Sequence, residues 1–279
     1  MRGHGSQTRA SSGEKWKWWH WLGLDLLTGG AVSMTVVTTA ATAIGTAGLV
    51  ATALPIIQTT VSSIDFGIIF FGTLFNGDPA WGGKRFDNWL KLELQPFNSL
   101  AGLFDYDKSA NWYEWPMQVI NNFGGEFLQD QIGTTFAHLQ NIGGNIDEIG
   151  YYKGRAIIRL NDGYIGNDMF LGISFGHYVF GHNIALNPND NSQGTKGLDL
   201  FAHEFGHTYQ SRISGPLYLF KYGIPSAAGG SKSEYDANKR AHKNGLPIGS
   251  WRSQESNRYN WWEDGLSPLL WPFMWIWNR

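Results

Sequence analysis

The stretch from His203 to His207, which reads H-E-F-G-H, constrains this chain more than any other segment. An apolar run precedes it, and Val, Ile and Pro are absent from 198–208, so the segment is free to be helical. Asp199 can accept hydrogen bonds from the first free backbone N–H groups of that helix. Residues four apart on a helix share one face, so both imidazoles can point at one position.

This spacing is typical of a metal site. Two histidines one turn apart can hold a zinc ion, and a Glu that follows the first can take a proton from water at the metal. The pattern predicts a zinc hydrolase with His203 and His207 as ligands, Glu204 as the catalytic base and Zn²⁺ as the cofactor. The alternative is a buried helix whose histidines are satisfied by hydrogen bonds.

A catalytic zinc site needs a third protein ligand. The extended pattern with a third His requires Gly at 210 and His at 213, but the chain has Gln210 and Ile213. Glu234 is the best candidate and lies near the start of a helix predicted over 231–242, where Ser and acidic residues are favoured. Asn238 follows one turn later on the same face, where its oxygen can accept the other N–H of a liganding His. The other acids that remain open as ligands are Asp236, Glu255, Glu263 and Asp264.

Three further side chains are candidate donors in the cleft. Tyr218 and Tyr222 lie between the two helices and could stabilise the oxyanion of a reaction intermediate. The alternative for both is a place in the aromatic core. His242 could serve as an auxiliary donor, or it could be an exposed residue at the end of its helix.

The arrangement resembles the gluzincin metallopeptidases, which carry H-E-x-x-H on one helix and a Glu ligand on the next. His203, Glu204, His207 and Glu234 match that pattern, while Asn238 stands where the family usually has Asp. An uncharged partner would polarise the liganding His less. The resemblance covers about forty residues, 198–239, and implies a zincin-like fold, peptide-bond hydrolysis and a peptide or protein substrate.

A second resemblance covers 203–226. The strings H-E-F-G-H-T-x-Q-S and G-P-L-Y-L-F-x-x-G-I-P-S are similar to C-terminal segments of Rhs-associated bacterial polymorphic-toxin-like proteins. This likeness implies an effector or surface protein with a larger Rhs-like carrier and an immunity protein as partners. No Rhs repeat is visible, so the chain would correspond to a tip region.

Composition narrows the partners and the compartment. Cys is absent, which rules out disulfides and thiolate ligands. The net charge is −2 and no long polybasic run is present, so we expect no nucleic-acid partner. We expect no cleavable signal peptide, because Met1–Lys17 is polar and the apolar stretch after it is too long. A secreted or membrane-associated bacterial protein is favoured.

The N-terminal region is unusually apolar. Leu26–Ile64 contains no charged residue, and a second apolar run covers 66–75. A helix of this length could cross a bilayer of about 30 Å, so contact of 26–75 with a membrane is one interpretation. A buried helical hairpin is the other, and Asp65 between the runs disfavours one long span. The alternative function is therefore a membrane-inserting or non-catalytic metal-binding module of a secretion or toxin particle.

The order of patterns predicts an α+β fold. Helices are expected over 86–94 and 115–139, the second broken at Gly124-Gly125, and short strands over 156–160, 169–175, 178–180 and 183–186. The expected fold is zincin-like, with a small sheet before the H-E-x-x-H helix and a second, Glu-bearing helix after it. The expected domains are a Trp-rich tail over 1–28, an apolar and amphipathic helical region over 29–150, and a zincin-like metallopeptidase domain over 151–279.

Overall fold

The computed structural model describes residues 48–76, 78–112, 114–162, 171–227 and 231–248. The chain divides into two compact units, Met1–Pro55 and Ile56–Arg279. In the first unit the description begins at Gly48, where a helix starts. The expected tail over 1–28 and the candidate ligands Glu255, Glu263 and Asp264 lie outside the described residues.

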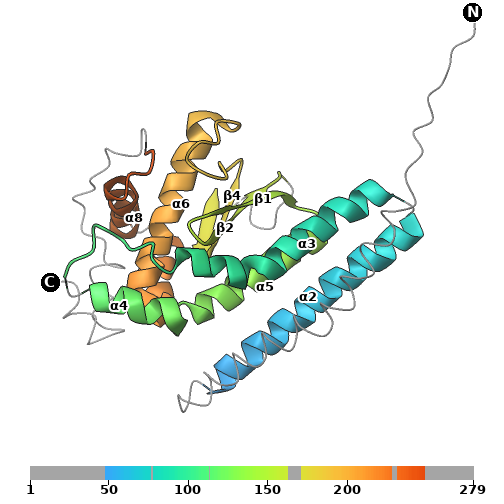
Figure 1. The fold of residues 1–279 in the computed structure, drawn as a ribbon, viewed down its shortest axis with the longest axis horizontal. Helices are drawn as coiled ribbons and strands as arrows, with labels where there is room; N and C mark the ends of the chain where they lie inside the picture. The colour runs from blue at the N-terminus through green and yellow to red at the C-terminus, as the bar shows by residue number, and fades with distance from the viewer. Residues whose placement is uncertain (1–47, 77, 113, 163–170, 228–230, 249–279) are drawn as a thin grey trace, which may run out of the picture. The chain divides into compact units, whose positions relative to one another are not determined.

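The second unit is a mixed α+β fold, which confirms the expected class (Figure 1). The described helices are α2 (Gly48–Asn76, which enters this unit at Ile56), α3 (Pro79–Ser99), α4 (Trp115–Ile120), α5 (Phe127–Gly143), α6 (Gly194–Ser214), α7 (Ile224–Ala227) and α8 (Ser231–Lys243). The strands are β1 (Ile146–Tyr152), β2 (Arg155–Leu160), β3 (Gly172–Phe175) and β4 (Tyr178–His182). Short 3-10 or π turns are η2 (Leu100–Gly102), η3 (Asn121–Gly125), η4 (Gly215–Leu217) and η5 (Leu219–Gly223).

The strands form one sheet in the order β1-β2-β4-β3. β1 and β2 are antiparallel, β2 and β4 are parallel, and β3 returns antiparallel to β4. The β1–β2 hairpin turns on Lys153 and Gly154, whose φ angles are 48° and 79°. Two positive φ angles suit the right-handed twist of a two-residue hairpin. A Cβ at 154 would also lie 2.4 Å from the backbone N of Gly102, so this turn requires glycine.

The expected strands are partly correct. β2, β3 and β4 fall on three of them, but the strand expected over 183–186 is wrong. Asn183 has a φ of 53°, and the N–H of Ala185 donates to Gly197 at the start of α6 instead of to a strand. β1 was not expected. Buried and exposed residues do not alternate regularly along it, and its register with β2 is irregular between Ile146 and Glu148.

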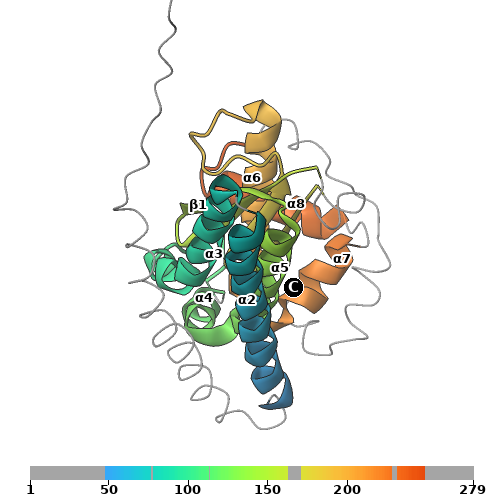
Figure 2. The ribbon, with the colours of Figure 1, turned by 90° about the vertical axis from the view of Figure 1, so that its right-hand side faces the viewer.

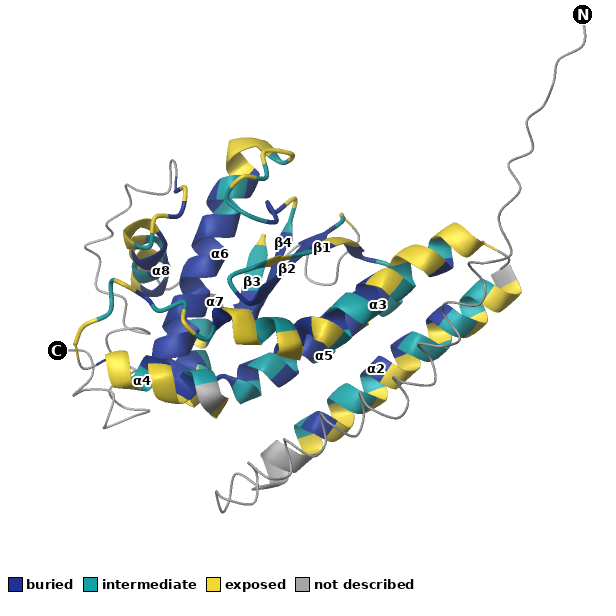
Figure 3. Cartoon of the chain, viewed as in Figure 1, coloured by how far each residue is buried: buried dark blue, intermediate teal, exposed yellow. Residues whose placement is uncertain are grey.

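Helices cover both faces of the sheet, so the fold has three layers (Figures 1 and 3). On one face, Ile157 and Val179 pack with Phe201, Phe205 and other apolar residues of α6 and α8. The other face carries a second cluster under α3 and α5. All six residues of β2 are buried, as expected for a central strand covered on both sides.

The second cluster joins segments from both sides of residue 150. Leu92 of α3 and Ala137 of α5 pack with Ile158 and Phe180 of the sheet, all within the second compact unit. Burial of these apolar side chains stabilises the three-layer arrangement. The division into domains at 28/29 and 150/151 stays a prediction.

α2 is one continuous helix that passes through Asp65 (Figure 2). Asp65, which we expected to disfavour one long membrane span, does not interrupt the helix, and its side chain is fully buried and paired. Its carboxylate lies 2.8 Å from Nδ1 of His138 and accepts a 3.0 Å hydrogen bond from Asn141, both on α5. On the other side of the ring, Glu93 of α3 lies 3.4 Å from Nε2 of His138. The buried ion cluster therefore ties α2, α3 and α5 together.

We predict that this cluster makes stability depend on pH. Burial disfavours the charged His138, but its hydrogen bonds with Asp65 and Glu93 outweigh burial and raise its pKa above the ordinary value. A raised folded-state pKa contributes stability that is complete below about pH 6.5 and is lost as pH rises through the folded-state pKa. Urea unfolding should therefore show the parent losing its advantage over His138→Gln as pH rises from 5.5 to 9.

At the acidic end of this range the parent should be more stable by about 3 kcal/mol, because the variant leaves the buried Asp65 and the partly buried Glu93 without their cation. An advantage that stays constant over the whole pH range would contradict the proposed pairing.

Candidate metal centre

The histidines stand on α6, which runs through the middle of the molecule. Every residue from Phe201 to Gly215 is buried, between the sheet on one side and α8 on the other. The helix ends where Gly215 takes a positive φ of 50° and Pro216 removes a donor. A central helix of this kind holds its side chains in fixed positions, which a metal centre requires.

His203, His207 and Glu234 meet between α6 and α8. Nε2 of His203 lies 2.8 Å from Oε2 of Glu234, and Nε2 of His207 lies 3.6 Å from Oε1. All three candidate ligand atoms lie within 4.8 Å of one another. In the part of the chain that the structure describes, this is the group of His and acidic side chains that could hold a metal ion.

The partners of the two Nδ1 atoms orient both Nε2 atoms toward Glu234 and the candidate metal position. Nδ1 of His203 lies 2.8 Å from Oδ1 of Asn238, and Nδ1 of His207 lies 2.8 Å from Oε1 of Gln210. An amide oxygen cannot donate, so each Nδ1 carries the proton. Gln210 is held in this orientation because its amide nitrogen donates to the carbonyl oxygen of Ser233 at 2.8 Å. These contacts fix the tautomers that a metal ion would need.

Gly206 lets α8 approach close enough to bring Glu234 to the histidines. A Cβ at 206 would lie 2.1 Å from the carbonyl oxygen of Ala237 and 2.6 Å from its carbonyl carbon. No L side chain fits at that distance, so the two helix backbones can touch only if this residue is glycine. Ala237 itself is fully buried.

Buried charge concentrates around the cluster. Burial alone would lower the pKa of His203, but its hydrogen bond with Glu234 and the charge of Glu204 raise it to about 9. Burial would raise the pKa of Glu234, yet His203 and His207 hold it well below its usual range. Glu234 is therefore an anion at neutral pH, ready to bind a cation.

Glu204 differs from Glu234 in its surroundings. Its carboxylate is buried, and burial raises its pKa above the ordinary value despite the two neighbouring imidazoles. Oε2 accepts a 2.8 Å hydrogen bond from Ser174 of β3. A carboxylate whose pKa lies closer to neutrality is suited to taking and returning a proton.

The structure separates the remaining candidates. Tyr218 is buried, and its pKa is raised first by burial and then by the charges of Glu204 and Glu234. The pKa of Tyr222 is raised by burial and by Asp236, on the opposite side of α8.

Two candidates from α8 are not part of the cluster. Asp236 pairs with Arg240 at 2.7 Å and accepts a 3.0 Å hydrogen bond from Gln210. His242 is exposed near the end of α8. Neither residue belongs to the group that could hold a metal ion.

Three contributors escaped the sequence reasoning. Gln210 lies one turn after His207, a spacing that could have suggested its role. Ser226 of α7 donates to Oε1 of Glu234, and Ser174 donates to Glu204 from β3. No pattern in the sequence relates either serine to its carboxylate, so only the tertiary fold reveals the two contacts.

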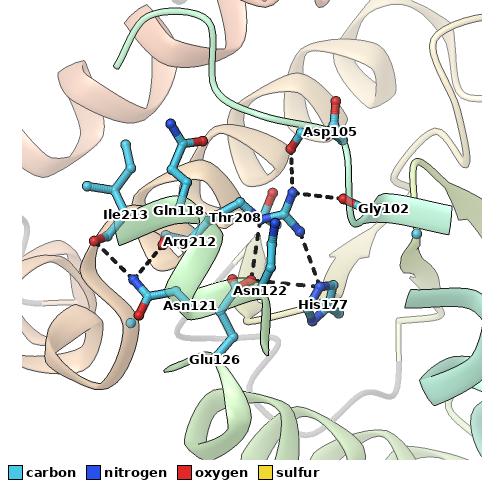
Figure 4. A network of polar contacts seen from close by, with 12 residues as sticks. Gly102, Asp105, Gln118, Asn121, Asn122, Glu126, His177, Thr208, Arg212 and Ile213 are labelled. Atoms are coloured by element: carbon cyan, nitrogen blue, oxygen red, sulfur yellow. Dashed lines mark hydrogen bonds and ion pairs between the residues drawn. The ribbon is translucent and has the colours of Figure 1, made fainter. Parts of the chain in front are cut away.

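The far end of α6 is anchored by a buried polar network (Figure 4). Arg212 donates to the carbonyl oxygens of Gly102 (3.0 Å) and Asp105, and it lies 3.4 Å from Glu126. Its guanidinium also lies 3.3 Å from His177, which Asp130 holds in turn. His177 is buried within this network, where the carboxylates of Asp130 and Glu126 outweigh burial and raise its pKa.

Comparisons of the chain with protein-family models, with curated protein sequences and with solved structures gave no match. The geometry of the centre therefore carries the functional argument.

We predict that Gly206→Ala abolishes metal binding. The added methyl group must push α8 away from α6, which moves Glu234 away from His203 and His207. Metal content per chain, measured by mass spectrometry after incubation with zinc and removal of excess metal, should fall from near one to near zero.

Gly83→Ala is the matched control. Gly83 is an exposed residue of α3 with no atom within 4 Å of the added Cβ, so this variant should keep its metal and gain up to about 1 kcal/mol of stability. Full metal content in Gly206→Ala would contradict the close helix contact.

Proposed function

We propose that this chain is a zinc-dependent metallopeptidase with a gluzincin-type centre. The observation that carries the proposal is the meeting of His203, His207 and Glu234, with their ligand atoms within 4.8 Å of one another. Two imidazoles and one carboxylate form a ligand set of catalytic zinc sites, which leave one coordination position open.

The chain's own residues supply the remaining chemistry. When bound, zinc polarises the scissile carbonyl and lowers the pKa of water toward about 7. Glu204 takes the proton of the attacking water and returns it to the leaving amine nitrogen, as its raised pKa favours. Tyr218 donates a hydrogen bond to the carbonyl oxygen as that atom gains negative charge.

A peptide substrate is supported by the position of β3. This strand is at the edge of the described sheet, and its Ser174 contacts the carboxylate of Glu204. An extended peptide can pair with an edge strand through main-chain hydrogen bonds, which would bring a peptide bond near this carboxylate. A zincin-like fold is proposed on the same grounds, together with the order of sheet, metal helix and Glu-bearing helix.

The likeness of 203–226 to toxin-like C-terminal segments supports a role as the effector tip of a larger secreted bacterial protein. A carrier and an immunity protein are the partners that this role would need.

The proposal predicts that two variants distinguish loss of zinc binding from loss of peptide hydrolysis alone. Glu234→Ala should lose both zinc and activity, because one ligand is removed. Glu204→Gln should keep about one zinc per chain but lose at least about 100-fold in kcat, because the base is gone. Zinc content is measured by mass spectrometry, and hydrolysis with a quenched-fluorescence peptide library.

Lys239→Ala is the control, since Lys239 is an exposed residue of the same helix. It should keep both zinc and activity. Zinc content unchanged in Glu234→Ala would refute the ligand set, and full activity in Glu204→Gln would refute the assigned base.

A second candidate function, membrane association, is favoured by α2. Within the described helices, Ala53–Phe75 is long and apolar enough to cross a membrane by length and composition. Its solvent side carries exposed apolar residues at helical spacing: Ile57, Ile64, Ile68, Phe71 and Phe75. The one charged residue of α2, Asp65, is on the opposite, buried side.

The hydroxyl groups of α2 also suit an apolar surrounding. Thr60 donates to the carbonyl oxygen of Ile56 at 2.7 Å, and Ser63 donates to that of Thr59 at 2.8 Å. A hydroxyl satisfied within its own helix loses little when lipid replaces water. We therefore propose that α2 lies on a bilayer with this face in the acyl boundary.

Co-sedimentation with phosphatidylcholine–phosphatidylglycerol vesicles tests this function. The double variant Phe71→Lys, Leu74→Lys should bind at least about tenfold more weakly, because each apolar side chain contributes about 1.5 kcal/mol or more. Leu171→Lys is the control, since Leu171 and Leu74 are both 64% exposed. Equal loss in the double variant and the control would argue against a specific face.

A further inference from the structure

The carboxylate of Glu204 is held by the sheet and not by its own helix. Oγ of Ser174 lies 2.8 Å from Oε2 of Glu204, and both residues are 4% exposed. The same hydroxyl lies 2.8 Å from the backbone oxygen of Glu204. A hydroxyl has one proton to donate, and the charged acceptor makes the stronger hydrogen bond.

Gly172 closes the other side of the carboxylate. It lies two residues before Ser174, so both face α6 from the same side of β3. A Cβ at 172 would lie 2.5 Å from Oε1 of Glu204 and 2.8 Å from its Cδ. The carboxylate can occupy this position only because residue 172 has no side chain.

Strand pairing holds both residues in place. Gly172 is opposite Gly181 of β4, and Ser174 is opposite Val179. Because β4 pairs in turn with the fully buried β2, the hydroxyl of Ser174 stands on a rigid support. Gly172 is partly exposed while Ser174 is buried.

We propose that Ser174 is a positioning residue for Glu204 and that Gly172 keeps room for its proton-accepting oxygen. This inference rests on the proposed function. Ser174 occupies Oε2 with a hydrogen bond, so Oε1, next to Gly172, is the oxygen that exchanges a proton with the reacting water. The edge strand thus orients the base of the reaction as well as supporting a substrate.

Ser174→Thr and Ser174→Val test the hydroxyl with side chains of nearly equal shape. With peptide substrate, the Val variant should lose about 10- to 100-fold in kcat with KM and zinc content unchanged, whereas the Thr variant should keep kcat within a few-fold of the parent. Gly172→Ala should lose kcat in the same way, because its methyl group displaces the carboxylate. A Val variant with the parent's kcat would overturn the inference.

A stability comparison decides the inference without reference to activity. The Thr variant should melt at a higher temperature than the Val variant, and this difference should shrink when Glu204→Ala is added to both. An equal difference in both backgrounds would mean that the hydroxyl serves the backbone oxygen, and would overturn the inference. Absence of hydrolysis by the parent would instead refute the proposed function, and the melting comparison would still decide whether Ser174 holds the carboxylate.

Discussion

The contact of α6 with α8 at Gly206 and Ala237 sets the geometry on which the candidate centre depends. With a glycine at this crossing, the helix backbones meet at a distance that no side chain would permit. Glu234 is one turn before Ala237 on α8, and His203 and His207 are on either side of Gly206 on α6. The packing of the two helices therefore places the Glu234 carboxylate opposite the two imidazoles.

Such a crossing needs a helix that is buried and cannot shift. α6 meets this requirement at its far end, where Arg212, Glu126 and His177 form hydrogen bonds and ion pairs inside the protein. Buried charges of this kind add little net stability over an apolar core, but leaving one of them without its partner costs about 3–5 kcal/mol. The network therefore favours one position of α6, and with it one position of the histidines.

The meeting of His203, His207 and Glu234 was predictable because it depends largely on local spacing. Residues four apart on a helix lie on the same face, which places His203 beside His207 on one helix. The same spacing places Glu234 beside Asn238 on the next helix. The α+β class and three strands also follow from patterns of this kind. Ser174 and Ser226 could not be predicted, since each reaches its carboxylate through contacts that depend on the folded chain. The burial of Asp65 and His138 could not be predicted either. A charged residue is expected at the surface unless a partner is known, and these two meet only in the folded chain.

The buried pairing of Asp65 has a consequence for how α2 can meet lipid. A helix that lies flat on a bilayer keeps Asp65 against His138 and Asn141, and the ion cluster is undisturbed. A helix that left the protein to span the bilayer would bring a carboxylate toward the hydrocarbon centre, at a cost of about 3 kcal/mol, and would uncover His138 and Glu93. If α2 meets a bilayer as proposed, the buried pairing of Asp65 therefore favours attachment at the surface over insertion.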